Sequence, residues 1–290
     1  MNNADVAFVT YRRIPELTDD DSLVAEALAD HNIRTDAVCW DDETANWLKY
    51  GAIVIRSTWD YHLRIAEFRA WIDRLAAMGA RLWNPPDVLR WNSDKRYLLS
   101  VGTENLRPPP TVVFDKGSCV ALEDFLQSRG WDEVVVKPTI SADGFSTERT
   151  TLDSAEDDQP LLDAMLTRSD VMVQPIVPQI RTQGELSLMF FGGAFSHAVS
   201  KRPTGGEFRV QERLGGIISL VDVAPSIVDR AEALLKSAVA RSLYARVDVV
   251  ETPERLVLME IELVEPSLFL HHAPESADAF ARAIISAATV

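Results

Sequence analysis

The sequence contains little cysteine and comparatively little basic charge. Only Cys39 and Cys119 occur among the 290 residues. They lie far apart and do not have metal-ligand spacing, so a reducing, cytoplasmic compartment is the simplest expectation. Lysine and arginine together number 29, against 44 aspartate and glutamate residues, which gives a net charge of −15. Because binding to nucleic-acid backbones needs a basic surface, we expect no nucleic-acid partner.

Long apolar runs are also missing, which disfavours a membrane partner. Met1 to Asp5 carry no basic region ahead of the first apolar segment, so we expect no signal peptide. With 47% hydrophobic and 25% charged residues, the composition is that of an ordinary globular protein. The length suits one large unit or two to three small domains.

The first third of the sequence alternates between strand and helix patterns. Apolar runs predict strands at 6–9, 33–38 and 50–55, and helices are predicted near Leu23–Leu28 and over 62–78. This order is typical of a parallel α/β unit. In such units ligands bind beyond the carboxyl ends of the strands. The segment Arg56–Tyr61 occupies that position and is a candidate substrate site.

Proline-rich segments divide the remainder. Arg107–Pro110 predicts a stiff connector, and Pro175 and Pro178 mark a second one. We therefore predict an N-terminal domain over 1–106, a small α+β subdomain over 107–178 and a strand-rich subdomain over 179–290. Within the last, strands are expected at 186–191, 194–201 and 208–213, and helices at 226–241 and 274–288.

The most informative stretch is a predicted hairpin made of Tyr244–Val250 and Leu256–Glu262. Side chains on a strand alternate between faces. Arg246 and Asp248 should therefore share one face of the first strand. Glu260 and Glu262 should share one face of the second, roughly 7 Å apart.

Three carboxylates that face a cleft without partners would repel one another, and a divalent cation removes that conflict. All-oxygen ligands suit Mg²⁺ or Mn²⁺. Asp248, Glu260 and Glu262 are thus candidate metal ligands. The alternative is a solvated outer face of an amphipathic hairpin.

Three further segments carry candidate chemistry. Lys137 ends an apolar strand, and the hydroxyl-rich loop after it, which includes Ser141, could present donors to phosphate; the alternative is an ordinary turn with an exposed lysine. The extended segment Gln174–Val177 could contact an adenine ring, or could simply connect two domains. Lys201 and Arg209 flank a glycine pair and could bind a carboxylate or phosphate, or could be surface charge.

Taken in order, these segments resemble the ATP-grasp superfamily. The matching elements are Lys95, the Val-Val-Lys137-Pro strand end, Gln174-Pro-Ile-Val, Gly184-Glu185-Leu-Ser, Lys201-Arg202, Arg209, Arg246-Val-Asp248 and Met-Glu260-Ile-Glu262. The chain is similar to the glutathione synthetase-like group within this superfamily. The motifs at 55–61, 92–95 and 262–269 are similar to the O-ureido-D-serine cyclo-ligase group of antibiotic biosynthesis, which forms D-cycloserine.

The resemblance implies a role for each matching residue. Lys95, Lys137 and Ser141 would contact the ATP phosphates. Gln174, Pro175, Ile176 and Val177 would line the adenine pocket, and Glu185 would touch the ribose. Lys201, Arg209 and Arg246 would be catalytic, and Asp248, Glu260 and Glu262 would bind two Mg²⁺ ions. Arg56, Ser57, Trp59, Asp60, Tyr61 and Ser267 would line the substrate site.

Two departures from the family pattern stand out. The last metal ligand is commonly asparagine in a Glu-x-Asn pattern, whereas this chain has Glu262. The loop after Lys137 also has fewer glycines than the glutathione synthetase pattern.

The resemblance implies an ATP-grasp fold, with an N-terminal α/β domain and two α+β subdomains that grip ATP. It also implies an ADP-forming carboxylate–amine ligase that works through an acylphosphate on an amino-acid-like small molecule. Two alternatives keep the fold: an ATP-binding regulatory protein without turnover, and a small-molecule kinase. The sequence leaves the choice between a homodimer and a homotetramer open.

Overall fold

Parallel strand pairing organises the first third of the chain. The computed structural model describes residues 6–142, 144–204, 209–210, 215–239 and 241–288. The first sheet has the order β2-β1-β3-β4, and its pairs are parallel. Its strands are β1 (Val6–Thr10), β2 (Thr35–Cys39), β3 (Ala52–Ile55) and β4 (Leu82–Trp83). The predicted parallel α/β unit is therefore present.

Helices and short 3₁₀ turns connect these strands. They are α1 (Asp19–Asp30), η1 (Trp47–Lys49), η2 (Tyr61–Arg64), α2 (Ile65–Ala77), α3 (Pro86–Asn92) and η3 (Lys95–Leu99). Helix α1 begins where expected, because the Thr18 side chain accepts a hydrogen bond from the backbone of Asp21 and three acids occupy the first turn. The helix predicted over 62–78 is divided into η2 and α2.

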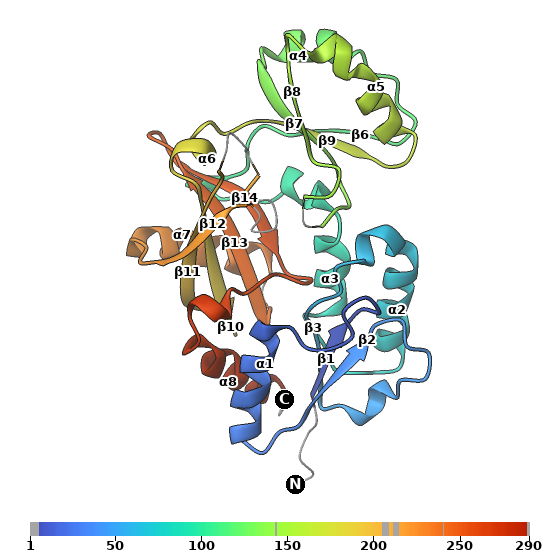
Figure 1. The fold of residues 1–290 in the computed structure, drawn as a ribbon, viewed down its shortest axis with the longest axis vertical. Helices are drawn as coiled ribbons and strands as arrows, with labels where there is room; N and C mark the ends of the chain where they lie inside the picture. The colour runs from blue at the N-terminus through green and yellow to red at the C-terminus, as the bar shows by residue number, and fades with distance from the viewer. Residues whose placement is uncertain (1–5, 143, 205–208, 211–214, 240, 289–290) are drawn as a thin grey trace.

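The second sheet, formed by the middle of the chain, lies at one end of the molecule (Figure 1). Its antiparallel order is β6-β9-β7-β8, and α4 and α5 pack against it. We call this unit the lid. Its elements are β6 (Val112–Phe114), α4 (Leu122–Arg129), β7 (Glu133–Pro138), β8 (Glu148–Thr151), α5 (Ala155–Leu166) and β9 (Val171–Pro175). Gly130 ends α4 in the left-handed conformation, at φ 64°.

The third sheet carries the predicted hairpin. Its order is β12-β11-β10-β13-β14-β5. Its strands are β5 (Leu106–Arg107), β10 (Glu185–Phe191), β11 (Ala194–Arg202), β12 (Ile217–Val221), β13 (Tyr244–Glu251) and β14 (Leu256–Glu262). The remaining elements are α6 (Gln179–Thr182), α7 (Pro225–Ala238), η5 (Leu270–His272) and α8 (Ser276–Ala288). Strands β13 and β14 pair antiparallel, as the sequence predicts.

Two expectations differ from the structure. The helix predicted from Ser93 is only the short turn η3, while α3 immediately before it was not predicted. In the strand predicted over 208–213, Arg209 and Val210 have no strand conformation. The other four positions lie outside the described residues. The division into three domains remains a prediction; the third sheet takes β5 from before the lid and its other strands from after it.

The hydrophobic core joins distant parts of the sequence. Phe8 and Leu28 of the first unit pack in one cluster with Phe280 and Ile284 of α8, and α8 lies beside α1 (Figure 1). A second cluster fills the space between the third sheet and α7. Among the described helices, none combines the length and apolar character that a membrane crossing requires.

Buried side chains also connect the N-terminal unit to the third sheet. The Asn84 amide donates to the carbonyls of Tyr244 and Leu263 at 3.0 and 2.8 Å, and its oxygen accepts from Leu243 N at 2.6 Å. Asn92 bonds the backbone of Ile261 and Leu263 in the same manner. The strand ends that carry the candidate acids are therefore fixed relative to the first sheet.

We predict that Asn84→Ala lowers the free energy of unfolding by about 3 kcal/mol, because three buried backbone groups lose their partner. Urea unfolding monitored by tryptophan fluorescence measures the change. Asn46→Ala, at an exposed position, is the matched control and should change stability by less than about 0.5 kcal/mol. Equal stability of the Asn84 and Asn46 variants would contradict the proposed connection.

Candidate active site

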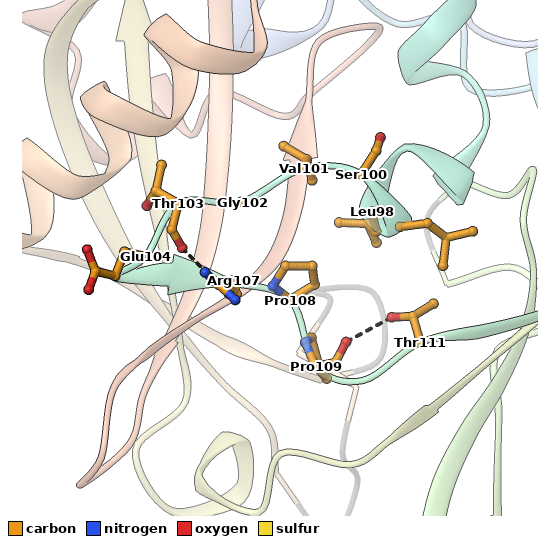
Figure 2. Close-up of a pocket in the computed structure, with 11 residues that line it drawn as sticks. Leu98, Ser100, Val101, Gly102, Thr103, Glu104, Arg107, Pro108, Pro109 and Thr111 are labelled. Atoms are coloured by element: carbon orange, nitrogen blue, oxygen red, sulfur yellow. Dashed lines mark hydrogen bonds between the residues drawn. The ribbon is translucent and has the colours of Figure 1, made fainter.

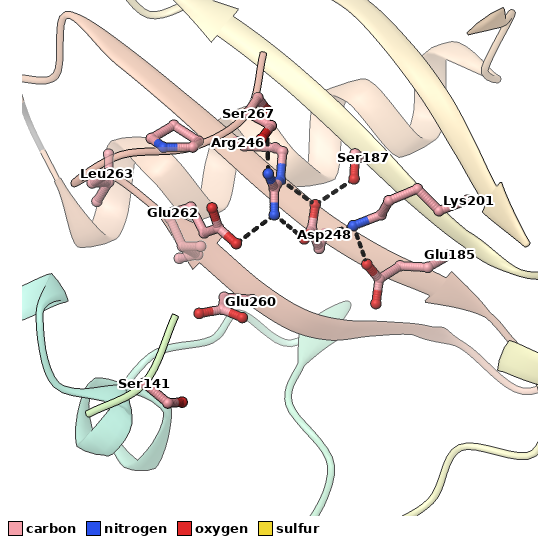
Figure 3. A network of polar contacts seen from close by, with 12 residues as sticks. Ser141, Glu185, Ser187, Lys201, Arg246, Asp248, Glu260, Glu262, Leu263 and Ser267 are labelled. Carbon is pink, nitrogen blue, oxygen red and sulfur yellow. Dashed lines mark hydrogen bonds and ion pairs between the residues drawn. The ribbon is translucent and has the colours of Figure 1, made fainter. Parts of the chain in front are cut away.

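The candidate site is built on one face of the β13–β14 hairpin. Arg246 lies opposite Glu262, and Asp248 lies opposite Glu260. Ser187 on β10 lies opposite Asp248 on the other side. Strand alternation thus places these side chains on one face, as the sequence predicts, and Figure 3 shows the carboxylates of Asp248 and Glu262 turned toward the Arg246 guanidinium.

Arg246 is the central cation of this network. Its Nε and Nη2 donate to the two oxygens of Asp248, each at 3.0 Å, and Nη2 also contacts Glu262. Its Nη1 donates to the carbonyl of Ser267 at 3.2 Å. The side chain is 8% exposed. The guanidinium therefore fixes the hairpin acids and the following loop in one arrangement.

Lys201 on β11 extends the network. Its Nζ lies 3.0 Å from Asp248 and 2.5 Å from Glu185. The Ser187 hydroxyl donates to Asp248 at 2.6 Å. Asp248 thus accepts from three side chains. Although its burial acts in the opposite direction, Arg246 and Lys201 hold the pKa of Asp248 well below its ordinary value.

Lys95 joins the hairpin to the lid. Its Nζ lies 2.6 Å from the carboxylate of Glu260 and donates to the Ser141 carbonyl at 2.9 Å. Its backbone N–H donates to Thr139 at 2.7 Å. Burial opposes the effect, but Lys95 lowers the pKa of Glu260. Lys137 is half-buried at the end of β7, and burial lowers its pKa, with Lys95 acting in the same direction.

Negative charge exceeds its local compensation at the end of the hairpin. Burial raises the pKa of Glu262 to about 7, and Glu260 and Asp248 add to the rise against the effect of Arg246. Burial and Glu262 raise the pKa of Glu265 to about 8. Such excess charge is what a cationic ligand would relieve.

The donor chemistry of the hairpin fits a hard divalent ion such as Mg²⁺, because it offers only carboxylate oxygens. In the described part of the chain, however, no three His, Cys, Asp or Glu side chains converge as a ligand set. The reason is visible in the contacts: Arg246, Lys201 and Lys95 engage Asp248, Glu260 and Glu262.

The predicted adenine segment lies at the end of β9. The Gln174 amide donates to the Thr111 hydroxyl at 2.8 Å, and Ile176 N donates to the carbonyl of Glu133 at 3.0 Å. Pro175 pairs with Val134, and Val177 is buried. Strand pairing therefore uses some of the backbone groups in this segment that were expected to contact an adenine ring. An adenine-binding role stays a prediction.

The predicted substrate segment is mostly buried. Arg56 is 3% exposed; its Nε donates to Asp21 at 2.7 Å and its Nη2 donates to the Pro266 carbonyl at 3.1 Å. Ser57 and Tyr61 are buried, and Trp59 is half-buried. Asp60 accepts from the Trp40 indole at 2.9 Å. The observed bonds of Arg56 are structural, and its substrate role remains a prediction.

The last predicted residues lie at the edges of the site. Ser267 is exposed, and only its carbonyl is engaged by Arg246. Arg209 Nη1 donates across to the lid, to the Thr147 carbonyl, at 3.5 Å. Most of the segment around Arg209, residues 205–216, lies outside the described residues.

A separate hollow lies beside the connector to the lid (Figure 2). It has a volume of about 410 Å³ and is lined by residues 98–104 and by Arg107, Pro108, Pro109 and Thr111. None of the charged residues of the hairpin network lines it. We do not assign the hollow to the active site.

Several residues that support the candidate site were not predicted from the sequence. Ser187 follows Glu185 at strand spacing and could have been found from that pattern. Tyr97 bonds the backbone of Ile261 in both directions at 2.8 Å. His197 on β11 contacts the Leu268 carbonyl at 2.8 Å. The last two contacts span long sequence distances, which the local pattern does not reveal.

Comparison with known proteins adds independent findings. Residues 6–84 match the model of the D-cycloserine synthetase DcsG N-terminal domain. The chain is 31% identical to the cycloserine biosynthesis protein DcsG of Streptomyces lavendulae over 275 residues, which cover 89% of this chain and 90% of that protein. The chain belongs to the DcsG family.

Solved structures agree with this membership. The crystal structure of D-cycloserine synthetase DcsG matches with a TM-score of 0.86 and 30% identity, covering 98% of this chain and 100% of that one. The D-alanine–D-alanine ligase of Bacillus anthracis, in complex with ATP, matches with a TM-score of 0.66 and 14% identity over 99% and 97% of the chains. The ATP-grasp ligase PsnB, in complex with a precursor variant, Mg and ADP, gives 0.65 and 12% over 99% of each chain.

The predicted resemblance and the predicted ATP-grasp fold are therefore confirmed. As a member of the DcsG family, the protein is an ATP-dependent ligase. The two more distant structures support the fold alone.

His197 yields a pH prediction. Burial lowers its pKa below the ordinary value of 6.5, so the unfolded chain binds a proton more readily than the folded one. The stability contribution is complete above about pH 6.5 and is lost as the pH falls through the lower folded pKa. We predict that the free energy of unfolding of the wild type, relative to His197→Gln, is constant above about pH 7 and decreases at acid pH.

Urea unfolding between pH 5 and pH 8 tests this prediction. Asn46→Ala, at an exposed position, provides a control, since it removes no group that titrates in this range and its stability relative to the wild type should not vary with pH. A pH-independent difference for His197→Gln would exclude a neutral buried imidazole.

Proposed function

We propose that this ligase cyclises O-ureido-D-serine, or a close amino-acid derivative, through an acylphosphate to give D-cycloserine. The observation that carries the proposal is the buried network in which Lys95, Lys201 and Arg246 hold the acids of one hairpin face. Family membership supports it, because the relative that shares 31% of its residues is a cycloserine biosynthesis protein.

The proposed residue roles follow the position of each charge. Lys95 and Lys137 approach the hairpin from the side of the lid and would bind the ATP phosphates together with the loop at Ser141. Lys201, Arg209 and Arg246 would bind the transferring phosphate and the substrate carboxylate. Gln174 to Val177 would contact adenine, and Glu185 the ribose. Arg56, Ser57, Trp59, Asp60, Tyr61 and Ser267 would form the substrate side.

Asp248, Glu260 and Glu262 would hold Mg²⁺, and two ions are the expected number, with Mn²⁺ as the alternative ion. The PsnB complex contains Mg and ADP, and the raised pKa of Glu262 indicates charge that a cation would balance. When bound, the metal supplies charge neutralisation at the phosphates. Rotation of Lys95 from Glu260 toward a phosphate would make that carboxylate available.

In the proposed reaction, a carboxylate oxygen of the substrate attacks the γ-phosphorus of ATP, and ADP leaves. The nitrogen bonded to the serine oxygen then attacks the acyl carbon, the five-membered ring closes and phosphate leaves. Hydrolysis of the carbamoyl group, as CO₂ and NH₃, gives D-cycloserine. Arg246 and Lys201 would stabilise the negative charge that develops. Closure of the lid would exclude water from the acylphosphate.

Product analysis distinguishes this function from its alternatives. The purified protein should release ADP and phosphate only when an amino-acid derivative is present, and chromatography should detect D-cycloserine when that derivative is O-ureido-D-serine. A stable phosphorylated product without phosphate release would support a small-molecule kinase. ATP binding without turnover across a panel of amino acids would support a regulatory protein.

Glu260→Gln should reduce ATP turnover by roughly 100-fold or more, because it removes a charged group from the metal and Lys95 site. Coupled measurement of ADP release gives the rate, and the unfolding midpoint reports on the fold. Glu254→Gln, at an exposed position in the turn of the same hairpin, should keep wild-type turnover. Wild-type turnover of a folded Glu260→Gln protein would remove the metal assignment.

A cytoplasmic location, the absence of a nucleic-acid or membrane partner, and assembly as a homodimer or homotetramer complete the proposal.

A further inference from the structure

The loop after the hairpin is held through its own carbonyl groups. We call residues Leu263–Leu268 the clamped loop. Five of its carbonyls receive bonds from side chains: Leu263 from Asn84 at 2.8 Å, Val264 from Tyr244 at 2.9 Å, Pro266 from Arg56 at 3.1 Å, Ser267 from Arg246 at 3.2 Å and Leu268 from His197 at 2.8 Å. The donors come from both the N-terminal unit and the third sheet. Such support preorganises a loop for binding.

Glu265 lies at the centre of the clamped loop and is half-buried. Asp248, Glu260 and Glu262 each contact a lysine or an arginine. Within the described part of the chain, the Glu265 carboxylate makes no such ion pair. Burying a carboxylate without a cation costs free energy. Because side chains hold the carbonyls of this loop, the fold keeps Glu265 in that position.

Buried polar atoms next to this loop also lack partners. Arg56 Nη1, Ser57 Oγ and Thr58 Oγ1 have no hydrogen-bond partner among the described residues, and these residues are 3%, 1% and 0% exposed. Arg56 reaches the Pro266 carbonyl, directly after Glu265. Buried polar groups are nearly always hydrogen-bonded. These groups lie directly after β3, in the segment that Arg56 links to the clamped loop.

Glu265 acts electrostatically on the substrate segment of the N-terminal unit. Tyr61 is 4% exposed; burial raises its pKa, and Glu265 has the next largest effect in the same direction.

Building on the proposed ligase function, we propose that Glu265 binds the α-ammonium group of the amino-acid substrate. The substrate carboxylate must remain available for phosphorylation, so the ammonium is the group that needs a fixed anion. One carboxylate suffices to pair with an ammonium. A divalent ion, in contrast, needs several ligands.

The main test compares Glu265→Gln with the wild type in steady-state kinetics with O-ureido-D-serine. The KM for the amino acid should rise roughly 10- to 100-fold, as expected for loss of a charge-assisted contact. The KM for ATP and the Mg²⁺ dependence should stay within about twofold of the wild type. Glu251→Gln removes the same charge from an exposed position at the end of β13 and should leave all of these constants unchanged.

A substrate analogue provides the decisive comparison. 3-(Ureidooxy)propanoate lacks only the amine, so the wild type should discriminate strongly against it. Glu265→Gln should lose most of that discrimination. Retention of wild-type discrimination would overturn the proposal, and a raised Mg²⁺ requirement with unchanged discrimination would assign Glu265 to the metal instead. The unfolding midpoint and ATP binding verify that the variant is folded.

Binding measurements separate this proposal from the function on which it rests. Calorimetric titration of O-ureido-D-serine into the protein with a non-hydrolysable ATP analogue requires no turnover. Amine-dependent binding that is lost in Glu265→Gln, without ring formation by the wild type, would refute the cyclisation but keep the ammonium site. Normal cyclisation by a Glu265→Gln protein with unchanged KM would refute only the ammonium site.

Discussion

The pairing of Arg246 with Asp248 and Glu262 is the interaction on which the arrangement of the site depends. Removing these charges from water is costly, and buried ion pairs often contribute little net stability. Their effect here is geometric, because one planar guanidinium fixes two strands and the Ser267 carbonyl at once. A change in the register of β13 and β14 would separate Glu262 from Arg246 and Glu260 from Asp248. The hairpin therefore determines where a phosphate or a carboxylate could bind.

The lid is attached differently from the rest of the molecule. Side chains such as Asn84 and Asn92 bond buried backbone between the N-terminal unit and the third sheet. The contacts of the lid include apolar packing by Met172 and charged groups such as Lys95 at Ser141 and Arg181 of α6 at Glu133. Charged contacts can exchange partners when a charged ligand arrives, whereas buried amide bonds cannot do so cheaply. This difference is consistent with movement of the lid relative to the N-terminal unit and the third sheet, which are fixed to each other.

Local sequence pattern was sufficient for the hairpin and its charged face, because strand alternation needs only neighbouring residues. It also predicted that the first unit is a parallel α/β unit, although not the order of its strands. It could not reveal that Arg56 pairs with Asp21 or that Asn84 bonds Leu263, since such contacts depend on how distant elements pack. The same limit applies to the substrate role of Arg56, which stays a prediction: a charged residue at a strand end has the same local pattern whether it faces a ligand or a buried aspartate.

The packing of α8 against α1 and the first sheet affects how the protein is made. Phe8 and Leu28 share a core with Phe280 and Ile284, so the earliest strands cannot complete their burial until α8 has left the ribosome. Ribosomes add roughly 5–20 residues per second, and the nascent N-terminal unit therefore keeps apolar surface exposed for many seconds. During that interval it is a natural client for a chaperone, and a message truncated before α8 would yield a chain prone to aggregation.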